Sequence, residues 1–477
     1  MIARPSIRLL SEDQVRSIHD TSLQLLGKVG VRVHHETVLR RLADAGAMVD
    51  AKGVARFPES IVMHALSLVP RQYTLHGRDA QRVARFGVGD LNLMSSPGQA
   101  AWIDQQTSRS RPATVADARS AILLGEALPN ITIVGAMAQP AELPPHSRAA
   151  WLAAELVKGA AKPTRCWVQN LAEARAVLEI YRTVAGGAEA LRRRPMTEAF
   201  LGPISPLQMP RDALDTVIEF VVAGQPITIG SMVMACGTAP ATLAGAVAQD
   251  NAEILAGIVI TQTLGPGTPI LYGGIPHILD PRTTACSFGS PEQGLTAIAM
   301  TQLGRSYGLP VYVNVGLTDS CHLDLQAGIE KAATLVQGAL AGADLFGHAG
   351  ICGADHGASL LSLATDDQVM QYVRRVVRGF DVTPCTLATG IIAGVGPGGN
   401  FLAEEHTAAN FRNEIWLCDS LWSRSVAGTG DDSSMAQRLS DRVMQILADQ
   451  TPTPMDPAIA KELDRIVRAA GDGAFGS

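Results

Sequence analysis

The chain has 477 residues, of which 47% are hydrophobic and 18% charged, so it can bury a large core and is too apolar to be disordered. Its net charge is −6 and it contains no basic-aromatic block, which argues against nucleic acid as a partner. The seven cysteines are scattered and form no Cys-x-x-Cys pair, which argues against a disulfide framework or a zinc ribbon. The N-terminus lacks the apolar core of a signal peptide, and no run of 18 apolar residues is present, so no membrane span is expected. We therefore predict a cytoplasmic protein.

The first 87 residues carry helical signals. Ser11 and Gln14 form a capping-box pattern ahead of an apolar stripe with helical spacing. Two further helices are predicted at about 36–45 and 58–69. We therefore expect residues 1–87 to form a helical extension packed on the following domain.

From residue 88 the sequence pattern changes, and short apolar runs alternate with helical patterns. The eight runs are Asn92–Ser95, Ile131–Ala138, Arg165–Gln169, Ala199–Gly202, Ile227–Met232, Pro269–Tyr272, Val311–Val315 and Leu345–His348. Eight such alternations predict an α/β fold, a (β/α)₈ TIM barrel over residues 88–404. A doubly wound open sheet is the alternative, although no Gly-x-Gly-x-x-Gly motif follows the first run.

The last segment, 405–477, reads as helical again. Leu439, Val443 and Ile446 lie at helical spacing and form an apolar stripe. We expect this tail to pack on the barrel with the N-terminal helices or to form a subunit contact, and the protein to be a homo-oligomer.

The active-site residues of such a barrel lie at the carboxyl ends of its strands. Polar and aromatic residues near those ends are therefore the candidates. These are Gln169 after the third run, Tyr272 and His277 at the sixth, Asn314 and Asp319 at the seventh, and Phe346 and His348 in the eighth. Alternation along a strand places Tyr312 with Asn314 on one face, and Phe346 with His348 on one face. Two structural alternatives remain open. Asn314 could be a buried amide that is hydrogen-bonded to the backbone, and His277 could be an ordinary loop histidine.

A metal site can be assembled on paper from five residues: His348, Cys352, His356, Cys321 and His322. Gly350 and Gly353 interrupt the helical register that this spacing requires, so no tightly bound metal is expected. No Gly-x-Ser-x-Gly, P-loop or His-Glu-x-x-His motif is present. The residues alone therefore indicate a barrel enzyme and leave the reaction open.

Several segments, in order along nearly the whole chain, resemble the trimethylamine methyltransferase family of corrinoid-dependent methyltransferases. They are Leu10–Gln14 with Val29–Val31, Leu75–Asp79, Gly237–Gly245 with Asn251–Glu253, Asp319–Ser320 with Gln326–Gly328 and Glu330–Lys331, Gly398–Leu402, and Phe411–Arg412 with Trp416. The chain looks like the branch without pyrrolysine, typified by glycine betaine methyltransferase, because ordinary residues stand near Cys321–His322, where relatives carry pyrrolysine. That departure puts trimethylamine in doubt as the substrate.

The resemblance implies methyl transfer from a quaternary amine or betaine to the Co(I) of a corrinoid (cobalamin) carried by a partner protein. A quaternary ammonium leaves as a neutral tertiary amine, so catalysis reduces to positioning and desolvation. A sulfonium donor, a zinc-dependent thiol methyltransferase and a non-catalytic ligand-binding protein remain alternatives.

The resemblance also implies roles for the candidate residues. Asp319 and His348 are the expected catalytic positions, and Asp319 and Glu330 can counter an ammonium group. Aromatic candidates for substrate contact are Tyr272, Phe346, Tyr312 and Trp167. Core packing is the alternative for each of them, and it is the favoured interpretation for Trp167 and Tyr312. The expected carboxylate-binding residues are His277, His348 and Gln169, and the expected shaping residues are Asn314, Glu330, Cys321 and His322.

Overall fold

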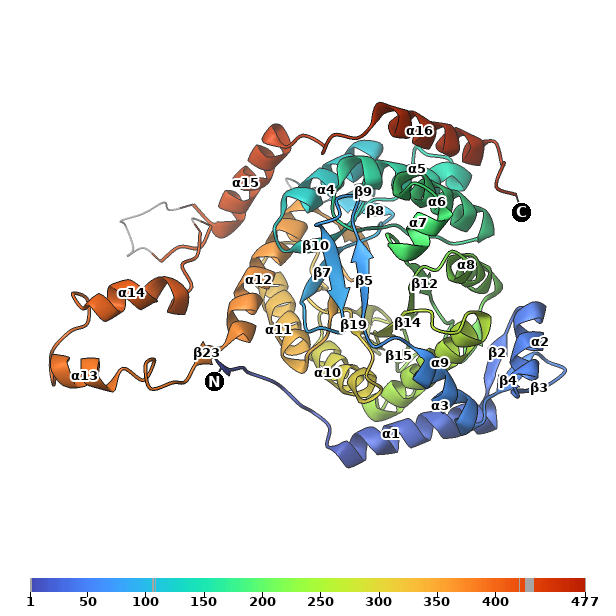
Figure 1. The fold of residues 1–477 in the computed structure, drawn as a ribbon, viewed down its shortest axis with the longest axis horizontal. Helices are drawn as coiled ribbons and strands as arrows, with labels where there is room; N and C mark the ends of the chain where they lie inside the picture. Colours follow the sequence, from blue (N-terminus) through green and yellow to red (C-terminus); the bar gives the residue numbers. More distant parts are fainter. Residues whose placement is uncertain (1, 105–106, 108, 420, 425–432, 477) are drawn as a thin grey trace.

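Eight parallel strands curl into a barrel ringed by helices in the computed structural model, which describes residues 2–104, 107, 109–419, 421–424 and 433–476 (Figure 1). The barrel strands are β7 (Asn92–Ser95), β10 (Ile131–Gly135), β11 (Thr164–Arg165), β12 (Ala199–Leu201), β14 (Ile227–Ser231), β16 (Ile270–Gly274), β19 (Val311–Val313) and β20 (Leu345–Ala349). The first strand, β7, pairs in parallel with both β10 and the last strand, β20. This wrap-around order confirms the predicted (β/α)₈ barrel, and the open-sheet alternative is wrong.

One side of the barrel differs from the rest. Within the described residues, β11 and β12 share no backbone ladder, although each pairs with its other neighbour. The two strands are therefore joined at this seam by side chains, which are described with the site below.

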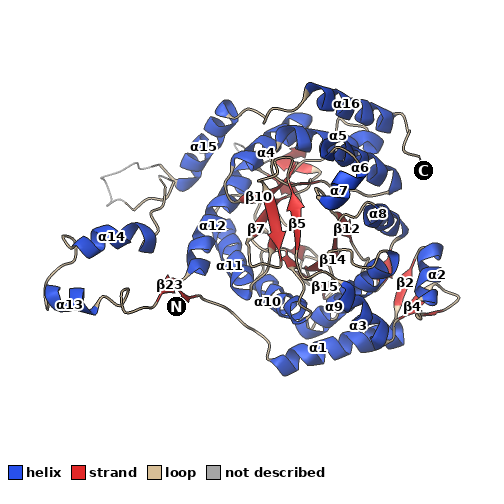
Figure 2. Cartoon of the chain, in the orientation of Figure 1, coloured by secondary structure: helices blue, strands red, loops and turns tan. Residues whose placement is uncertain are grey.

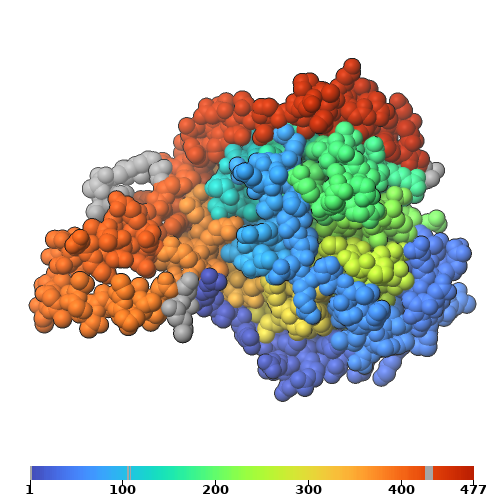
Figure 3. Space-filling model, in the orientation of Figure 1, coloured from blue at the N-terminus to red at the C-terminus, as the bar shows by residue number. Residues whose placement is uncertain are grey.

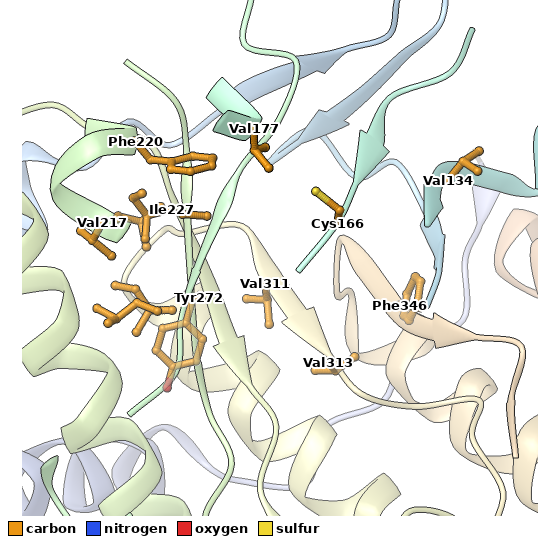
Figure 4. Close-up of a cluster of buried hydrophobic side chains, with 14 of the residues drawn as sticks. Val134, Cys166, Val177, Val217, Phe220, Ile227, Tyr272, Val311, Val313 and Phe346 are labelled. Atoms are coloured by element: carbon orange, nitrogen blue, oxygen red, sulfur yellow. The ribbon is translucent and has the colours of Figure 1, made fainter. Parts of the chain in front are cut away.

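Helices connect the strands and cover the outside of the barrel (Figure 2). They are α4 (Val115–Ala127), α5 (Pro145–Gly159), α6 (Leu171–Ala185), α7 (Ala188–Arg193), α8 (Arg211–Val222), α9 (Leu243–Leu264), α10 (Pro291–Ser306), α11 (Leu325–Ala341) and α12 (Leu360–Arg378). Outward-facing strand residues such as Ile227, Val311 and Val313 pack in the apolar layer between strands and helices (Figure 4). By length and composition α9 could cross a membrane, but 83% of its apolar window is buried inside the protein, as expected of a core helix.

A β-hairpin closes the amino-terminal end of the barrel. It consists of β5 (Tyr73–His76) and β6 (Val83–Phe86). Leu75 and Phe86 are fully buried in one cluster with inward-facing barrel residues such as Tyr312. In Figure 1, β5 accordingly crosses the centre of the ring of helices. The hairpin therefore blocks the amino-terminal end of the barrel in the part of the chain that the structure describes.

The N-terminal segment contains the expected helices and also strands. The helices are α1 (Glu12–Gln24), followed by a π-helical turn (Leu25–Val29), α2 (Glu36–Asp44) and α3 (Glu59–Leu68). Strands β2 (Val31–Val33), β3 (Met48–Val49) and β4 (Val54–Arg56) form a sheet with β13 (Gln208–Met209), so the purely helical expectation needs correction. Valines at 31 and 33 are buried and Arg32 between them is exposed, the alternation of a half-buried strand.

Two small sheets raise a rim at the carboxyl end of the barrel. One contains β15 (Met234–Ala235), β17 (His277–Leu279) and β18 (Cys286–Ser287). The other contains β8 (Ala101–Ile103), β9 (Ser110–Pro112), β21 (Ile351–Cys352) and β22 (Gly357–Ala358). Both are built from chain that leaves barrel strands at their carboxyl ends, so they surround the mouth.

The barrel ends with α12, earlier than the expected boundary at residue 404. After β23 (Phe380–Asp381), which pairs with β1 (Ile2–Ala3), the chain forms α13 (Thr389–Val395) and α14 (Glu405–Glu414). No residue of these two helices is buried, and they project from the body of the molecule as an arm (Figure 3).

The chain then returns to the barrel. Helix α15 (Met435–Asp449) packs on α12 and α4, and α16 (Pro457–Gly471) packs on α5 and α6. Leu439 and Val443 of the predicted stripe are buried there. The N-terminal helices instead pack on α9, so the two ends of the chain cover different parts of the barrel. Of the predicted tail, residues 420, 425–432 and 477 lie outside the described residues.

Candidate active site

Four rings meet on the inner wall of the barrel near its mouth. Trp167 lies edge-on to Phe200 at 5.4 Å and to His348 at 5.6 Å between centroids. Tyr312 lies 6.0 Å from His348, and its hydroxyl is 3.2 Å from His348 Nε2. Trp167 and Phe200 are partly exposed, whereas Tyr312 is fully buried. These four residues, called the ring cluster below, therefore form an aromatic surface that solvent reaches at Trp167 and Phe200.

Asn314 connects the ring cluster to a second pair of rings. Its Oδ1 accepts a hydrogen bond of 3.3 Å from the Tyr312 hydroxyl, and its Nδ2 lies 3.5 Å from His277 Nε2. The His277 ring packs on Phe288 at 4.2 Å. The predicted face shared by Tyr312 and Asn314 is confirmed, and it lines the inside of the barrel.

Both histidines are held neutral. Burial, with further contributions from Arg165 and His277, lowers the pKa of His348 to about 3. Burial lowers the pKa of His277 to about 4. Burial also raises the pKa of the Tyr312 hydroxyl. The inner surface formed by these side chains is therefore uncharged at neutral pH.

A buried ion pair lies beneath the rings. Arg165 Nη1 is 2.7 Å from Glu198 Oε1, and the two side chains are 1% and 0% exposed. Glu198 Oε2 also accepts a hydrogen bond of 3.0 Å from Thr228 Oγ1. The Arg165 guanidinium carbon lies 5.8 Å and 5.5 Å from the ring centroids of Trp167 and Phe200. The pair spans the seam between β11 and β12.

Arg165 also keeps an open donor. Its Nη2 is buried and has no hydrogen-bond partner within the part of the chain that the structure describes. Neither Arg165 nor Glu198 nor Phe200 was among the candidates predicted from the sequence. The available signal was a charged residue inside one apolar strand and another directly before the next.

Asp319, the expected catalytic carboxylate, is occupied by protein donors. It accepts hydrogen bonds from Ser287 Oγ at 2.5 Å and from the backbone N–H groups of Phe288 and Gly289 at 2.6 Å and 3.1 Å. These bonds attach the segment 287–289 to the loop after β19 and hold Phe288 against His277. Asp319 is thus placed to position the site.

Glu330 has a similar arrangement on α11. Its Oε2 accepts hydrogen bonds of 2.7 Å from Thr318 Oγ1 and of 2.9 Å from the Asp319 backbone N–H, and its Oε1 accepts one from Gln326 Nε2. Its carboxylate therefore anchors the loop after β19 to the helix that follows.

Tyr272 and Phe346 need correction as substrate contacts, because both point outward. The Tyr272 hydroxyl donates a 2.7 Å hydrogen bond to Asn251 Oδ1 on α9. Phe346 packs in the helix-facing core beside Gly338 of α11 (Figure 4). Their strand neighbours Leu271 and Leu345 face inward instead.

His348 was expected on the same face as Phe346, and this is also wrong. The pairing of β20 with β7 shifts register between Phe346 and Ala349. The regular alternation is lost at that point, and His348 faces the barrel interior with Tyr312.

The remaining candidates lie apart from the ring cluster. Gln169 is exposed ahead of α6. Cys321 and His322 are exposed and line a separate pocket of about 300 Å³ together with Cys352. Among the described residues, no group of three His, Cys, Asp or Glu is placed to hold a metal ion.

Comparisons with known proteins cover the whole architecture. Residues 2–471 match the family model described as trimethylamine methyltransferase. The chain is 32% identical over 472 residues to a glycine betaine methyltransferase of Desulfitobacterium hafniense strain Y51, covering 98% of both chains. It is 30% identical over 469 residues to the trimethylamine methyltransferase MttB of D. hafniense strain DSM 10664 / DCB-2, covering 97% of this chain and 94% of that one.

Solved structures show the same fold at low identity. The monomethylamine methyltransferase MtmB of Methanosarcina barkeri aligns with a TM-score of 0.55 and 11% identity, covering 98% of this chain and 89% of that chain. At this identity the likeness concerns the fold alone.

Proposed function

Because the chain belongs to the trimethylamine methyltransferase family and is a methyltransferase, we propose that it takes a methyl group from a quaternary amine or betaine and delivers it to the Co(I) of a corrinoid protein. The ring cluster is the observation that carries the choice of donor. Aromatic residues make up only 4% of the chain, yet three of them, with His348, gather at the open end of the barrel.

The ring cluster has the chemistry to hold a quaternary ammonium group. An aromatic face attracts such a cation by about 0.5–2 kcal/mol, depending on how far water is excluded. His348 and His277 would repel the donor if they were protonated, but their pKa values lie at about 3 and about 4. The surface therefore stays attractive to a cation throughout the neutral range.

The proposed reaction requires little acid–base catalysis from this chain. A corrinoid in the Co(I) state would supply the electron pair for the new bond to the methyl group, while the electrons of the broken C–N bond leave on a neutral tertiary amine. No proton has to be delivered to that leaving group. The residues of the chain bind the donor, orient one N-methyl group toward the mouth and exclude water.

Access to the site supports docking of the corrinoid protein at the mouth. The β5–β6 hairpin fills the amino-terminal end with Leu75 and Phe86. The carboxyl end carries the partly exposed Trp167 and Phe200 and the rim sheets around them. A large cofactor can therefore reach a bound methyl group from that side.

The test uses purified protein, a Co(I) corrinoid protein or free Co(I) cobalamin, and a panel of donors. The panel contains glycine betaine, other trimethylammonium compounds, trimethylamine and a dimethylsulfonio acid. We expect the Co(I) absorbance to fall with at least one quaternary donor. With trimethylamine we expect it to stay unchanged. Absence of transfer from every quaternary amine, betaine and sulfonium donor contradicts the proposal.

Two further features belong to the proposal. We place the enzyme in the cytoplasm, which fits its seven free cysteines. We also expect a homo-oligomer, because α13 and α14 bury none of their residues within their own chain. Ile392 of α13 and Leu387 just before it expose apolar side chains that a second subunit could cover. Light scattering of the purified protein measures the oligomeric state.

A further inference from the structure

Arg165 is a charged side chain buried inside the barrel with part of its binding capacity unused. A guanidinium carries five N–H donors in a planar fork. Nη1 faces Glu198 at 2.7 Å, while Nη2 has no partner within the described residues. Buried polar groups are usually satisfied, so an open donor on a 1% exposed arginine needs an explanation. A ligand oxygen provides one.

The charges of the Arg165–Glu198 pair, which forms the floor beneath the ring cluster, indicate a ligand that carries both an anionic and a cationic group. Arg165 and Glu198 neutralise each other, and Glu198 Oε2 accepts a hydrogen bond from Thr228 Oγ1. Arg165 Nη2 and Glu198 Oε1 are both buried without a hydrogen-bond partner among the described residues, so the pair offers an open donor of a cation beside an open acceptor of an anion. A carboxylate is the group that an arginine fork binds best. A zwitterion leaves the total charge of this interior unchanged, whereas a bare cation or anion alters it.

The order of Arg165 and Trp167 along the barrel axis determines the orientation of such a ligand. Arg165 belongs to β11, and Trp167 follows two residues later, closer to the mouth. A carboxylate on Arg165 thus lies deep, and an ammonium group among the rings lies above it. The N-methyl groups then face the only end of the described barrel that the hairpin does not close.

Short distances limit the ligand's length. The Arg165 guanidinium carbon is 5.8 Å from the Trp167 ring and 5.5 Å from the Phe200 ring. A cation attracted by these rings lies within about 6 Å of their centroids. A carboxylate oxygen on Nη2 lies about 2.8 Å from that nitrogen. These distances make the two subsites neighbours, which a betaine with a short linker between its charges can span.

We propose that Arg165, held by Glu198, is the carboxylate-binding residue of the donor site and makes the enzyme specific for short betaines, bound with the carboxylate down and the methyl groups toward the mouth. This inference rests on the proposed function, because it assigns the donor of that reaction. It adds a residue that selects the donor and a reason why simple tetraalkylammonium ions are poor ligands.

Calorimetric binding to four compounds tests it. They are glycine betaine, its uncharged-tail amide, its carbon isostere 3,3-dimethylbutanoate, which keeps only the carboxylate, and the longer 4-(trimethylammonio)butanoate. The wild type should bind glycine betaine at least about 30-fold more tightly than the amide, because the charge-assisted hydrogen bond from Arg165 Nη2 to a carboxylate is lost with the amide. The longer betaine should bind at least about tenfold more weakly than glycine betaine.

The informative variant is Arg165→Gln/Glu198→Gln, which removes both charges and keeps the side-chain volumes similar. Its preference for glycine betaine over the amide should fall to within about threefold, with little change in binding of the amide. A matched control is Lys331→Gln/Asp366→Asn, which removes another buried ion pair, 2.8 Å long, whose lysine is already hydrogen-bonded to backbone carbonyls. The control should keep the wild-type preference.

A wild type that does not discriminate glycine betaine from the amide overturns the inference, as does a double variant that keeps the full preference. If the double variant fails to fold, Arg165→Lys replaces it, because lysine keeps the charge and loses the fork; an unchanged preference there also overturns the inference. Binding of 3,3-dimethylbutanoate that depends on Arg165, without methyl transfer from any donor, leaves the carboxylate site intact and contradicts the proposed function instead.

Discussion

Arg165 and Glu198 form a 2.7 Å ion pair between β11 and β12, neighbouring barrel strands that share no backbone ladder in the described part of the chain. The pair therefore links the two sides of the barrel where hydrogen-bonded pairing is interrupted. It also forms the floor beneath the ring cluster. The same contact that closes the barrel at this seam is thus part of the proposed donor site.

The first prediction concerns stability. Glu198→Gln leaves an uncompensated buried cation and should lower the free energy of unfolding by about 3–5 kcal/mol, because removing one partner of a buried pair is strongly destabilising. Arg165→Gln/Glu198→Gln should cost less than either single change. Urea unfolding followed by circular dichroism measures all three. Additive losses in the double variant contradict a coupled pair.

The second prediction concerns pH. His348 and His277 have folded-state pKa values of about 3 and about 4, below the ordinary value near 6.5. Below pH 6.5 the unfolded chain therefore binds protons that the folded chain does not, and stability falls with falling pH. Each histidine contributes a slope of up to about 1.4 kcal/mol per pH unit between 6.5 and its folded pKa, and no slope above 6.5.

Substitution isolates this effect from the carboxylates that titrate nearby. His348→Gln should flatten the decline between pH 6.5 and 4 by the contribution of one histidine, measured by urea unfolding at several pH values. His146→Gln, which changes an exposed histidine at the start of α5, should leave the profile as in the wild type. Identical profiles for wild type and His348→Gln are the contrary outcome.

The third prediction concerns Asp319. Asp319→Ala removes the acceptor of three hydrogen bonds from 287–289 and should lower methyl transfer about 10²-fold through lost positioning of Phe288 and His277. Asp319→Asn keeps an acceptor oxygen and should recover part of the rate. Release of the segment should also speed tryptic cleavage at the nearby exposed Arg282.

Asp324→Asn is the control, because Asp324 caps α11 through the Ala327 N–H and asparagine caps equally well. It should change neither the rate nor the cleavage. A loss of rate in Asp319→Ala with wild-type cleavage, and no recovery with asparagine, argues for direct contact between Asp319 and the donor.

The fourth prediction separates the rings from the floor. Trp167→Leu should weaken glycine betaine and its amide by the same factor, about tenfold, because both ligands carry the trimethylammonium group that the ring attracts. Trp151→Leu, at a tryptophan of α5 beneath Arg119, should leave both affinities unchanged. Calorimetry gives the affinities. A selective loss of the zwitterion in Trp167→Leu places the carboxylate, rather than the ammonium, at the ring.

The sequence was sufficient to predict seven of the barrel strands because most are short runs of apolar residues buried on both faces. The third predicted run, Arg165–Gln169, is the exception, because it overlaps β11 (Thr164–Arg165) at Arg165 alone. Burial on both faces also hides which face looks inward. Leu271 and Tyr272, or Leu345 and Phe346, are apolar neighbours of which either can face the helices. Only tertiary packing decides between them, and the candidate residues Tyr272 and Phe346 were assigned to the wrong side for that reason.

The site itself was predictable in part. Asn314 stands out as a polar residue within an apolar strand, and its inward position follows. Asp319 was predicted at the end of the seventh strand, but β19 ends at Val313 and Asp319 lies in the loop that follows. Its partners at 287–289 come from another loop, so its bonds could not be foreseen. Arg165 and Glu198 become a pair only through the closure of the barrel, which brings the two strands together.

The hairpin plug has a kinetic consequence. With Leu75 and Phe86 filling the amino-terminal end of the described barrel, the proposed donor, its product and the proposed corrinoid protein would all approach from the carboxyl end. The donor must enter before the partner docks, and the demethylated amine can leave only after the partner has departed. Steady-state turnover should therefore follow a compulsory order, with excess corrinoid protein inhibiting by trapping the empty or product-loaded enzyme.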